Sequence, residues 1–247
     1  MLQGVGTLSR IEILDLFCSA GGASEGFHQY FEDSCNITGV DIKPQKNYPF
    51  QFILGDALEF LRDNWRKFDY IHASPPCQRF SAMTKGRWKD RLEAHPDLIS
   101  PVRDIIIKTG LPYDIENVAG AKDELINPIM LCGTMFGLQT KMGSQLRRHR
   151  YFELSWGDIP TPACDHKDGS VIGVYGGGQN PSRKKYPNTI GIYGNSGGSS
   201  NRDGLLGFTT QDRRDAMGIQ WMTGKELSQA IPPAYTKYIA QFIPIRR

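Results

Sequence analysis

The residue best suited to nucleophilic chemistry is a cysteine that directly follows two prolines. Cys77 lies in the run SPPCQ at positions 74–78, after an apolar stretch, and the prolines prevent a helix from continuing there. A thiolate is a strong nucleophile, and nearby cations would lower the pKa of this thiol. The position therefore predicts a cysteine that is presented for reaction.

A carboxylate and two arginines complete the candidate catalytic set. Glu116 ends the apolar stretch PYDIEN, where its carboxyl group could meet a base bound above Cys77. Arg148 and Arg150 precede the apolar YFEL, and alternate side chains of an extended segment point the same way. Two guanidinium groups on one face can hold a carboxylate and donate to a carbonyl oxygen.

A loop of small residues and two aspartates indicate a nucleotide-like ligand. The apolar stretch 11–17 leads into SAGG, whose backbone N–H groups could approach such a ligand; GxGxxG, the dinucleotide fingerprint, is absent. Asp41 ends the stretch NITGVDI and could accept from a ribose diol, and Asp56 in FQFILGDA could accept from an adenine amine. Each aspartate alone is more often a helix cap or a turn residue. The loop and the two aspartates together stand at three successive strand ends, and this combination favours an adenosyl ligand.

The elements that position these residues alternate between strand and helix. Strands are predicted at 11–17, 36–42, 50–57, 68–76 and 112–117, with helices after the first, third and fourth. This alternation predicts an α/β fold with a doubly wound, mostly parallel sheet that has helices on both faces. Ligands of such sheets bind at the carboxyl ends of the strands, where the polar residues lie.

Residues 155–210 are rich in Gly, Pro, Ser and Asn and predict a small inserted lobe. The main domain would then comprise 1–154 and 211–247. The similar pieces GVYGGGQN (173–180) and GIYGNSGG (191–198) are either strands with glycine turns or glycines that let backbone approach a nucleic acid.

Basic residues gather in two places. They are dense just after Cys77, over 79–91, which fits a loop closing on phosphates better than a solvated loop. A second group in the lobe could contact phosphate or simply be solvated. The candidate nucleic-acid contacts are Gln78, Arg79, Ser81, Lys85, Arg87, Arg183, Lys184 and Lys185.

Composition is that of an ordinary globular protein, with 39% hydrophobic and 22% charged residues. The net charge of +3 is too small to indicate a nucleic-acid partner by itself. No stretch approaches the ~20 apolar residues of a membrane span, and no secretory signal is present. The five cysteines are scattered, and Cys164-x-His166 has no second pair at a zinc-ligand spacing. We expect a cytoplasmic monomer with reduced thiols and no metal.

Six motifs resemble those of the cytosine-C5 DNA methyltransferase family. DLFCSAGG resembles its cofactor motif DLFxGxGG, SPPCQRFS its catalytic PCQxFS motif, and IENV its ENV motif. LRRHRYF resembles QxRxR, RRDAMGIQWM the RExxxxxGFP helix, and QAIPPAY the closing GNAVPP segment. The resemblance covers nearly the whole chain. It implies a class I S-adenosylmethionine-dependent methyltransferase fold, Rossmann-like, with a small target-recognition lobe.

The resemblance also implies roles. Cys77 would add to C6 of a cytosine, and C5 would then take the methyl group of S-adenosylmethionine, leaving S-adenosylhomocysteine. Glu116 would bond to N3 and the exocyclic amine, Arg150 would donate to O2, and Arg148 would orient Glu116. The implied partner is duplex DNA, from whose stack the target base must leave.

The implied cofactor contacts lie at the strand ends and in the closing segment. They are Phe17, Ser19, Ala20, Gly21, Gly22, Asp41, Ile42, Asp56, Ala57, Pro75, Gln229 and Ile231. Ser19 replaces a motif glycine, and we expect its backbone to need no positive φ. Ser228 and Gln229 stand where the closing motif has glycine and asparagine.

Two alternatives remain. One branch of the family methylates tRNA with the same motifs, although its CFT tripeptide is absent here. A catalytically inactive homologue could serve as a DNA-binding module, but such a binder has no physical need for all four candidate catalytic residues. The sequence favours a DNA methyltransferase.

Overall fold

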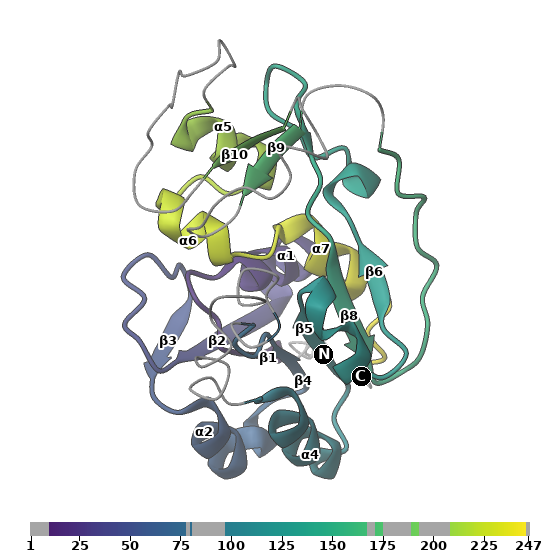
Figure 1. Cartoon of the computed structure of the whole chain (residues 1–247). Helices are drawn as coiled ribbons and strands as arrows, with labels where there is room; N and C mark the ends of the chain where they lie inside the picture. Colours follow the sequence, from purple (N-terminus) through teal and green to yellow (C-terminus); the bar gives the residue numbers. More distant parts are fainter. Residues whose placement is uncertain are drawn as a thin grey trace, which may run out of the picture.

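A mostly parallel sheet forms the centre of the molecule (Figure 1). The computed structural model describes residues 10–77, 80, 97–166, 171–174, 189–192 and 208–245. Within this part, seven strands pair in the order β3-β2-β1-β4-β5-β8-β6. β1 to β5 are parallel, and β8 runs antiparallel to β5 and β6. The strands are β1 (Ile11–Leu16), β2 (Cys35–Asp41), β3 (Gln51–Leu54), β4 (Tyr70–Ala73), β5 (Tyr113–Asn117), β6 (Ile129–Leu131) and β8 (Arg150–Leu154). The predicted doubly wound sheet is confirmed.

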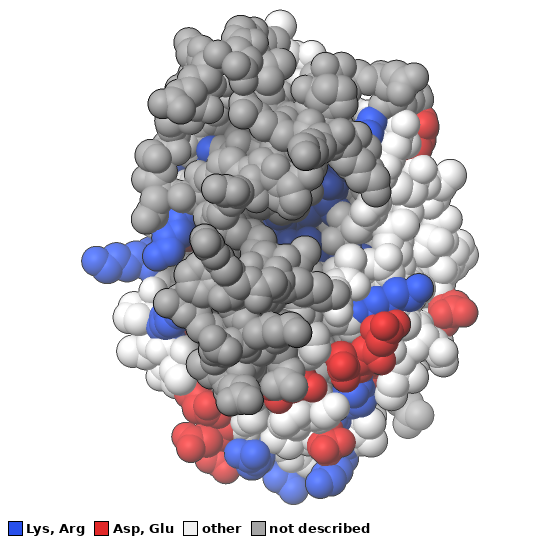
Figure 2. Space-filling view, in the orientation of Figure 1, with Lys and Arg blue, Asp and Glu red and all other residues white. Residues whose placement is uncertain are grey.

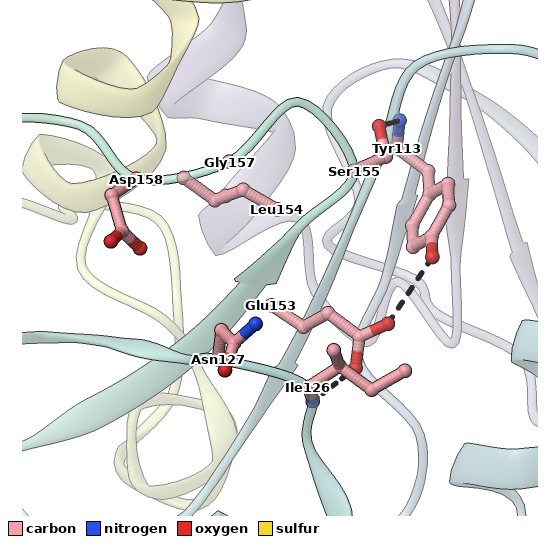
Figure 3. Close-up of a pocket in the computed structure, with 8 residues that line it drawn as sticks. All are labelled: Tyr113, Ile126, Asn127, Glu153, Leu154, Ser155, Gly157 and Asp158. Atoms are coloured by element: carbon pink, nitrogen blue, oxygen red, sulfur yellow. Dashed lines mark hydrogen bonds between the residues drawn. The ribbon is translucent and has the colours of Figure 1, made fainter.

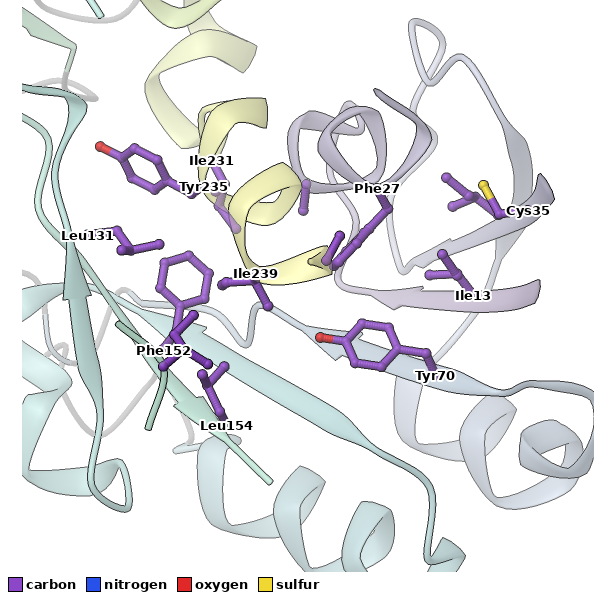
Figure 4. Packing of buried hydrophobic residues seen from close by; sticks show 14 of the residues in the cluster. Ile13, Phe27, Cys35, Tyr70, Leu131, Phe152, Leu154, Ile231, Tyr235 and Ile239 are labelled. Carbon is purple, nitrogen blue, oxygen red and sulfur yellow. The ribbon is translucent and has the colours of Figure 1, made fainter. Parts of the chain in front are cut away.

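Helices cover both faces of this sheet. Successive residues of a strand point to opposite faces, and in β1 Ile13 joins one core whereas Leu14 joins the other. The first core includes α1 (Gly22–Phe31) and α7 (Pro233–Ala240), and Figure 4 shows Phe27 and Ile239 there. The second includes α2 (Ala57–Asn64) and α4 (Ile99–Thr109). Burial on both faces explains why the strands read as continuous apolar runs. Short 3-10 turns occur at η1 (Glu32–Ser34), η2 (Trp65–Lys67), η3 (Ala119–Glu124) and η4 (Gly133–Phe136).

Glycines allow α1 and α7 to touch through their backbones. A Cβ on Gly26 would lie 2.1 Å from the carbonyl oxygen of Pro233 and 2.0 Å from Oγ1 of Thr236. The Thr236 hydroxyl donates to the Ala23 carbonyl at 2.8 Å. No larger residue fits at position 26 unless the two helices separate.

A second, three-stranded sheet lies apart from the first, in the order β10-β9-β7. It consists of β7 (Gln145–Leu146), β9 (Val171–Val174) and β10 (Thr189–Ile192). β9 and β10 are parallel and pair Gly173 with Gly191, so the two similar sequence pieces start in register with each other. The strand interpretation of these pieces is therefore correct for 171–174 and 189–192. Their glycine-rich remainders lie outside the described residues.

The packing draws the boundary of the small lobe differently from the predicted 155–210. α5 (Thr210–Met217) and α6 (Gly224–Gln229) contribute Met217 and Leu227 to the same core as Ile172 of β9. By contrast, Ile159 belongs to the core of the main sheet, and the Tyr238 hydroxyl donates to the carbonyl of Pro160. The boundary differs because α5 and α6 bury their apolar residues in the same core as the small sheet. Among the described helices, none has the length and apolar character needed to cross a membrane.

Candidate active site

The carboxyl ends of β1, β2, β4 and β5 bring the predicted site together. The chain runs from β1 outward through β2 and β3 and then returns to β4 on the other side of β1. Such a reversal opens a crevice at the carboxyl ends of the strands, where ligands of doubly wound sheets bind. Asp41 ends β2, Cys77 follows β4 and Glu116 is the second-last residue of β5.

The loop after β1 is strained. Phe17, Ser19 and Gly21 have φ angles of 59°, 45° and 85°, in the left-handed region that disfavours side chains. The expectation that Ser19 needs no positive φ is therefore wrong: the backbone conformation that suits the motif glycine is kept by a serine. Asp41 supports the loop by accepting from the Ser19 N–H at 3.1 Å, and the Trp221 indole donates to the Ala20 carbonyl at 3.0 Å. Strain of this kind is typical of functional sites.

The surroundings of this loop fit an adenosyl ligand. α1 begins beneath it, and no side chain caps its first N–H groups, which suits an anionic group such as a carboxylate. Ile42 follows Asp41 with 69% of its surface exposed, an apolar side chain that a purine could cover. Asp56 accepts from the N–H groups of Leu58 and Glu59 through Oδ1, so it serves at least as the helix cap weighed from the sequence. Among the remaining predicted cofactor contacts, Ala57 and Ile231 are buried and Gln229 is exposed.

Glu116 and Arg150 form a nearly buried ion pair. Nε of Arg150 lies 2.9 Å from Oε1 of Glu116, and their side chains are 13% and 8% exposed. The contact is poorly aligned for a hydrogen bond, so Oε1 has no hydrogen-bond partner among the described residues. Burial raises the pKa of Glu116, although the charges of Arg150 and His72 oppose the rise. A buried carboxyl group that keeps a proton can donate through one oxygen and accept through the other.

Arg148 is buried and reaches toward the C-terminal segment. Its Nη2 donates to the carbonyl oxygens of Ser228 at 2.9 Å and Ala230 at 2.8 Å. The carbonyl of Arg148 in turn accepts from the Tyr235 hydroxyl at 2.5 Å. The ion pair with Glu116 belongs to Arg150, so the orienting role predicted for Arg148 falls at least in part to Arg150. Arg148 ties the closing segment to β8.

Cys77 is half-buried and held by a neighbouring strand. The Asn117 amide donates to the Pro75 carbonyl at 3.0 Å, which fixes the turn that carries the thiol. Burial raises the pKa of Cys77, the charges of Arg150 and Arg148 oppose the rise, and Glu116 adds to it. The expectation of a lowered pKa considered only cations and missed the burial. Asn117 was within a recognised motif, but its function as an anchor depends on the pairing of β4 with β5.

A chain of buried polar side chains lies along β4 and β5, next to the candidate catalytic residues. Nδ1 of His72 is 2.8 Å from Oδ2 of Asp114, its cross-strand partner, and Nε2 is 2.8 Å from Oγ of Ser74. The Tyr70 hydroxyl donates to the other oxygen of Asp114. Burial alone would lower the pKa of His72, but the charge and hydrogen bond of Asp114, together with the charges of Asp15 and Glu116, raise it to about 9. Sequence reasoning missed this network, because nothing in either strand signals which residues face each other.

A cavity of about 270 Å³ lies at the opposite end of β5, lined by residues that include Tyr113, Asn127 and Asp158 (Figure 3). Glu153 points into this region but already accepts from Arg103, from the Tyr113 hydroxyl at 3.2 Å and from the Ile126 N–H at 2.8 Å. The carboxylate of Glu153 is satisfied, and the cavity lies at the start of β5 and the end of antiparallel β8, away from the carboxyl ends of the parallel strands. We therefore assign Glu153 a structural role and no ligand to the cavity.

Charge is unevenly distributed on the face that carries the site. Figure 2 shows Lys and Arg side chains in the middle of this face, whereas side chains of both signs mix toward the end where α2 and α4 lie. All eight predicted nucleic-acid contacts, in 78–87 and 183–185, lie outside the described residues.

Comparisons with known proteins agree with this arrangement. A solved structure of a DNMT2 mutant from Spodoptera frugiperda matches with a TM-score of 0.56 and 14% identity, over 94% of this chain and 99% of that one. The fold is that of a class I S-adenosylmethionine-dependent methyltransferase.

The family follows from the sequence matches. Residues 11–124 match the family described as C-5 cytosine-specific DNA methylase. The Type II methyltransferase M1.BsuMI of Bacillus subtilis (strain 168) is 25% identical over 182 residues, 59% of this chain and 43% of that protein. The match thus spans less than half the length of that curated relative. Both matches support the cytosine-C5 methyltransferase family for the part of the chain that they cover.

Proposed function

We propose that this protein methylates C5 of a cytosine in duplex DNA through a covalent bond between Cys77 and C6. The observation that carries the proposal is the convergence of Cys77 with the buried Glu116–Arg150 pair at adjacent strand ends. Residues 11–124, which include Cys77 and Glu116, also match a family of C-5 cytosine-specific DNA methylases.

The thiol begins the reaction. The Cys77 sulfur forms a bond to C6, and the electron pair of the C5–C6 double bond moves to C5, which becomes nucleophilic. Because burial favours the thiol, its proton must leave as the base binds, and the charges of Arg150 and Arg148 favour the resulting thiolate. This step needs a base held directly above the sulfur.

Glu116 offsets the charge that develops in the ring. Its raised pKa allows the carboxyl group to donate a proton to N3, while its other oxygen accepts from the exocyclic amine. Oε1, which lacks a hydrogen-bond partner among the described residues, is available for that amine. Arg150 would donate to the O2 carbonyl while its Nε stays near Glu116.

The loop after β1 would hold the methyl donor. Asp41, Ile42 and the uncapped start of α1 would bind S-adenosylmethionine, which supplies an electrophilic methyl group when bound. A base then removes the C5 proton, the electron pair of that C–H bond restores the C5–C6 double bond, and the Cys77 sulfur leaves C6 as a thiolate, which regenerates the free enzyme.

The test is a trapping experiment with 5-fluorocytosine, whose fluorine cannot leave as a proton does. Duplex DNA carrying this base should form an adduct with the protein in the presence of S-adenosylmethionine, and peptide mapping should locate it on Cys77. Cys77→Ser should form none, whereas Cys35→Ser, which removes a buried thiol at the start of β2, should form the adduct normally. An adduct on another cysteine, or active enzyme without an adduct, contradicts the mechanism.

The same assay distinguishes the nucleic acid. Duplex DNA and tRNA should be offered separately, each with radiolabelled methyl donor. Methylation of duplex DNA supports the proposal, and methylation of tRNA alone would assign the chain to the RNA-modifying branch instead. Binding of DNA without methyl transfer to either substrate would favour an inactive homologue.

A further inference from the structure

Two thiols and two imidazoles that the proposed chemistry does not use converge at one point beside the main sheet. One ligand atom from each of the four lies within 4.8 Å of all the others. The residues are Cys132, His149, Cys164 and His166. They come from three separate segments of the chain. The expectation of no metal considered only spacing along the sequence, which does not reveal this cluster.

The edge of the sheet presents the first two residues as a pair. β6 and β8 are antiparallel, with Leu131 opposite Arg150, so the next positions in that register are Cys132 and His149. Cys132 is buried, and His149 is half-buried. The hydrogen bonds between β6 and β8 therefore limit how far Cys132 and His149 can move away from each other.

The second pair comes from the segment that follows β8. Cys164 and His166 are two residues apart, in a stretch without helix or strand. Pro160 anchors the start of this stretch to α7 through its hydrogen bond with Tyr238. Beyond that anchor, Cys164 and His166 contact the other cluster residues, and Cys164 also lies near the Thr134 hydroxyl.

The distances suit a tetrahedral ion. Sγ of Cys164 lies 3.1 Å from Nε2 of His166 and 3.5 Å from Nε2 of His149, and Sγ of Cys132 lies 3.4 Å from Nε2 of His166. A tetrahedral zinc ion with bonds of about 2.3 Å to sulfur and 2.0–2.1 Å to nitrogen separates the two elements by about 3.6 Å. Small movements of the side chains are enough to reach that geometry.

Neighbouring groups support the ligands as they do in known metal sites. The Thr134 hydroxyl donates to Sγ of Cys132 at 3.3 Å and lies 3.7 Å from Sγ of Cys164. The rings of His149 and His166 are stacked, with centroids 5.1 Å apart, and the Nε2 atom of each lies within 3.5 Å of a cluster sulfur. Hydrogen bonds to ligating atoms orient them and tune their affinity.

We propose that these four residues bind one zinc ion that serves a structural purpose. Two thiolates and two imidazoles select zinc over magnesium or calcium, which prefer oxygen ligands. Four protein ligands fill a tetrahedral coordination sphere and leave no position for substrate. A nucleophilic Cys–His pair would need only one residue of each kind.

The ion would fix the start of β8. His149 lies between Arg148 and Arg150, and Nη1 of Arg150 donates to the His149 carbonyl at 2.9 Å. Holding the imidazole therefore restrains the backbone from which both guanidinium groups extend. The ion would also clamp the segment 161–166 against the sheet edge.

The test is the zinc content of the full chain, purified without chelators and measured by mass spectrometry of the metal. We expect about one zinc per chain in the wild type and in Cys35→Ser. Cys164→Ser and His166→Ala should bind zinc at least about tenfold more weakly, since even supporting residues change affinity by that factor. His166 is exposed, so its variant should fold, and circular dichroism would confirm this.

Cobalt(II) and hydrogen exchange provide independent readouts. Cobalt in the wild type should give a thiolate-to-metal charge-transfer band that weakens in Cys164→Ser and is unchanged in Cys35→Ser. Chelation should speed amide exchange in 161–166. Three results would overturn the proposal: no zinc bound after addition of zinc chloride, equal zinc in the wild type and both ligand variants, or a disulfide between Cys132 and Cys164 in freshly purified protein.

Discussion

Ser19→Gly should stabilise the protein, although it removes a side chain. The φ of 45° at Ser19 places a residue with a Cβ in the left-handed region, which costs about 1–2 kcal/mol. Glycine avoids that cost but gains freedom in the unfolded chain, which offsets about 0.4–1 kcal/mol. The hydrogen bond from the backbone N–H at position 19 to Asp41 is kept, because it does not involve the side chain. The net gain should be about 0.5–1 kcal/mol in the free energy of unfolding.

Urea unfolding and thermal melting measure this gain. For a chain of this size, 1 kcal/mol corresponds to a rise of about 2–4 °C in Tm. Ser19→Ala is the matched control, because it removes the same hydroxyl but keeps the Cβ and hence the strain. Ser19→Ala should leave the stability unchanged or lower it slightly. Equal stabilisation by alanine and glycine would refute the strain argument and point to the hydroxyl instead.

Two further predictions concern the sheet and its helices. The pKa of His72 is about 9 in the fold against an ordinary 6.5, so its pairing with Asp114 should stabilise fully below about pH 6.5 and be lost as the pH rises through 9. The loss should approach about 3 kcal/mol in urea titrations and should be much smaller in Asp114→Asn; equal losses in both proteins would argue that His72 is neutral. Gly26→Ala should lower the stability by at least about 1–3 kcal/mol, because its Cβ would lie 2.1 Å from the Pro233 carbonyl. Gly55→Ala, whose Cβ meets nothing within 4 Å, is the control, and similar melting temperatures for the two variants would show that α1 and α7 can separate at no cost.

The sequence predicts the catalytic sheet well because its signals are local. Alternating strands and helices determine that Asp41, Cys77 and Glu116 come to one edge of the sheet, whatever the details of packing. Strands were one of two interpretations of the pieces at 173–180 and 191–198, and the register of β9 with β10 supports it for the first two residues of each piece.

Other features depend on contacts that no local pattern encodes. The sequence hints at the positive φ of Ser19 only because this serine stands where the motif has glycine. His72 and Asp114 meet because of the register of β4 with β5, and Cys132 meets His149 because of that of β6 with β8. Burial, which raises the pKa of Cys77, is likewise a property of the folded chain and cannot be counted from neighbouring charges.

The close contact of α1 with α7 has a consequence for synthesis on the ribosome. Ala23 and Thr236, which share a hydrogen bond across these helices, are 213 positions apart in the chain. Phe27, fully buried in the finished fold, packs in a core that α7 completes. For most of translation, the emerging polypeptide therefore carries an apolar helix face with no permanent cover. Such a nascent chain is a target for chaperones, and the packing of α1 must wait until α7 leaves the exit tunnel.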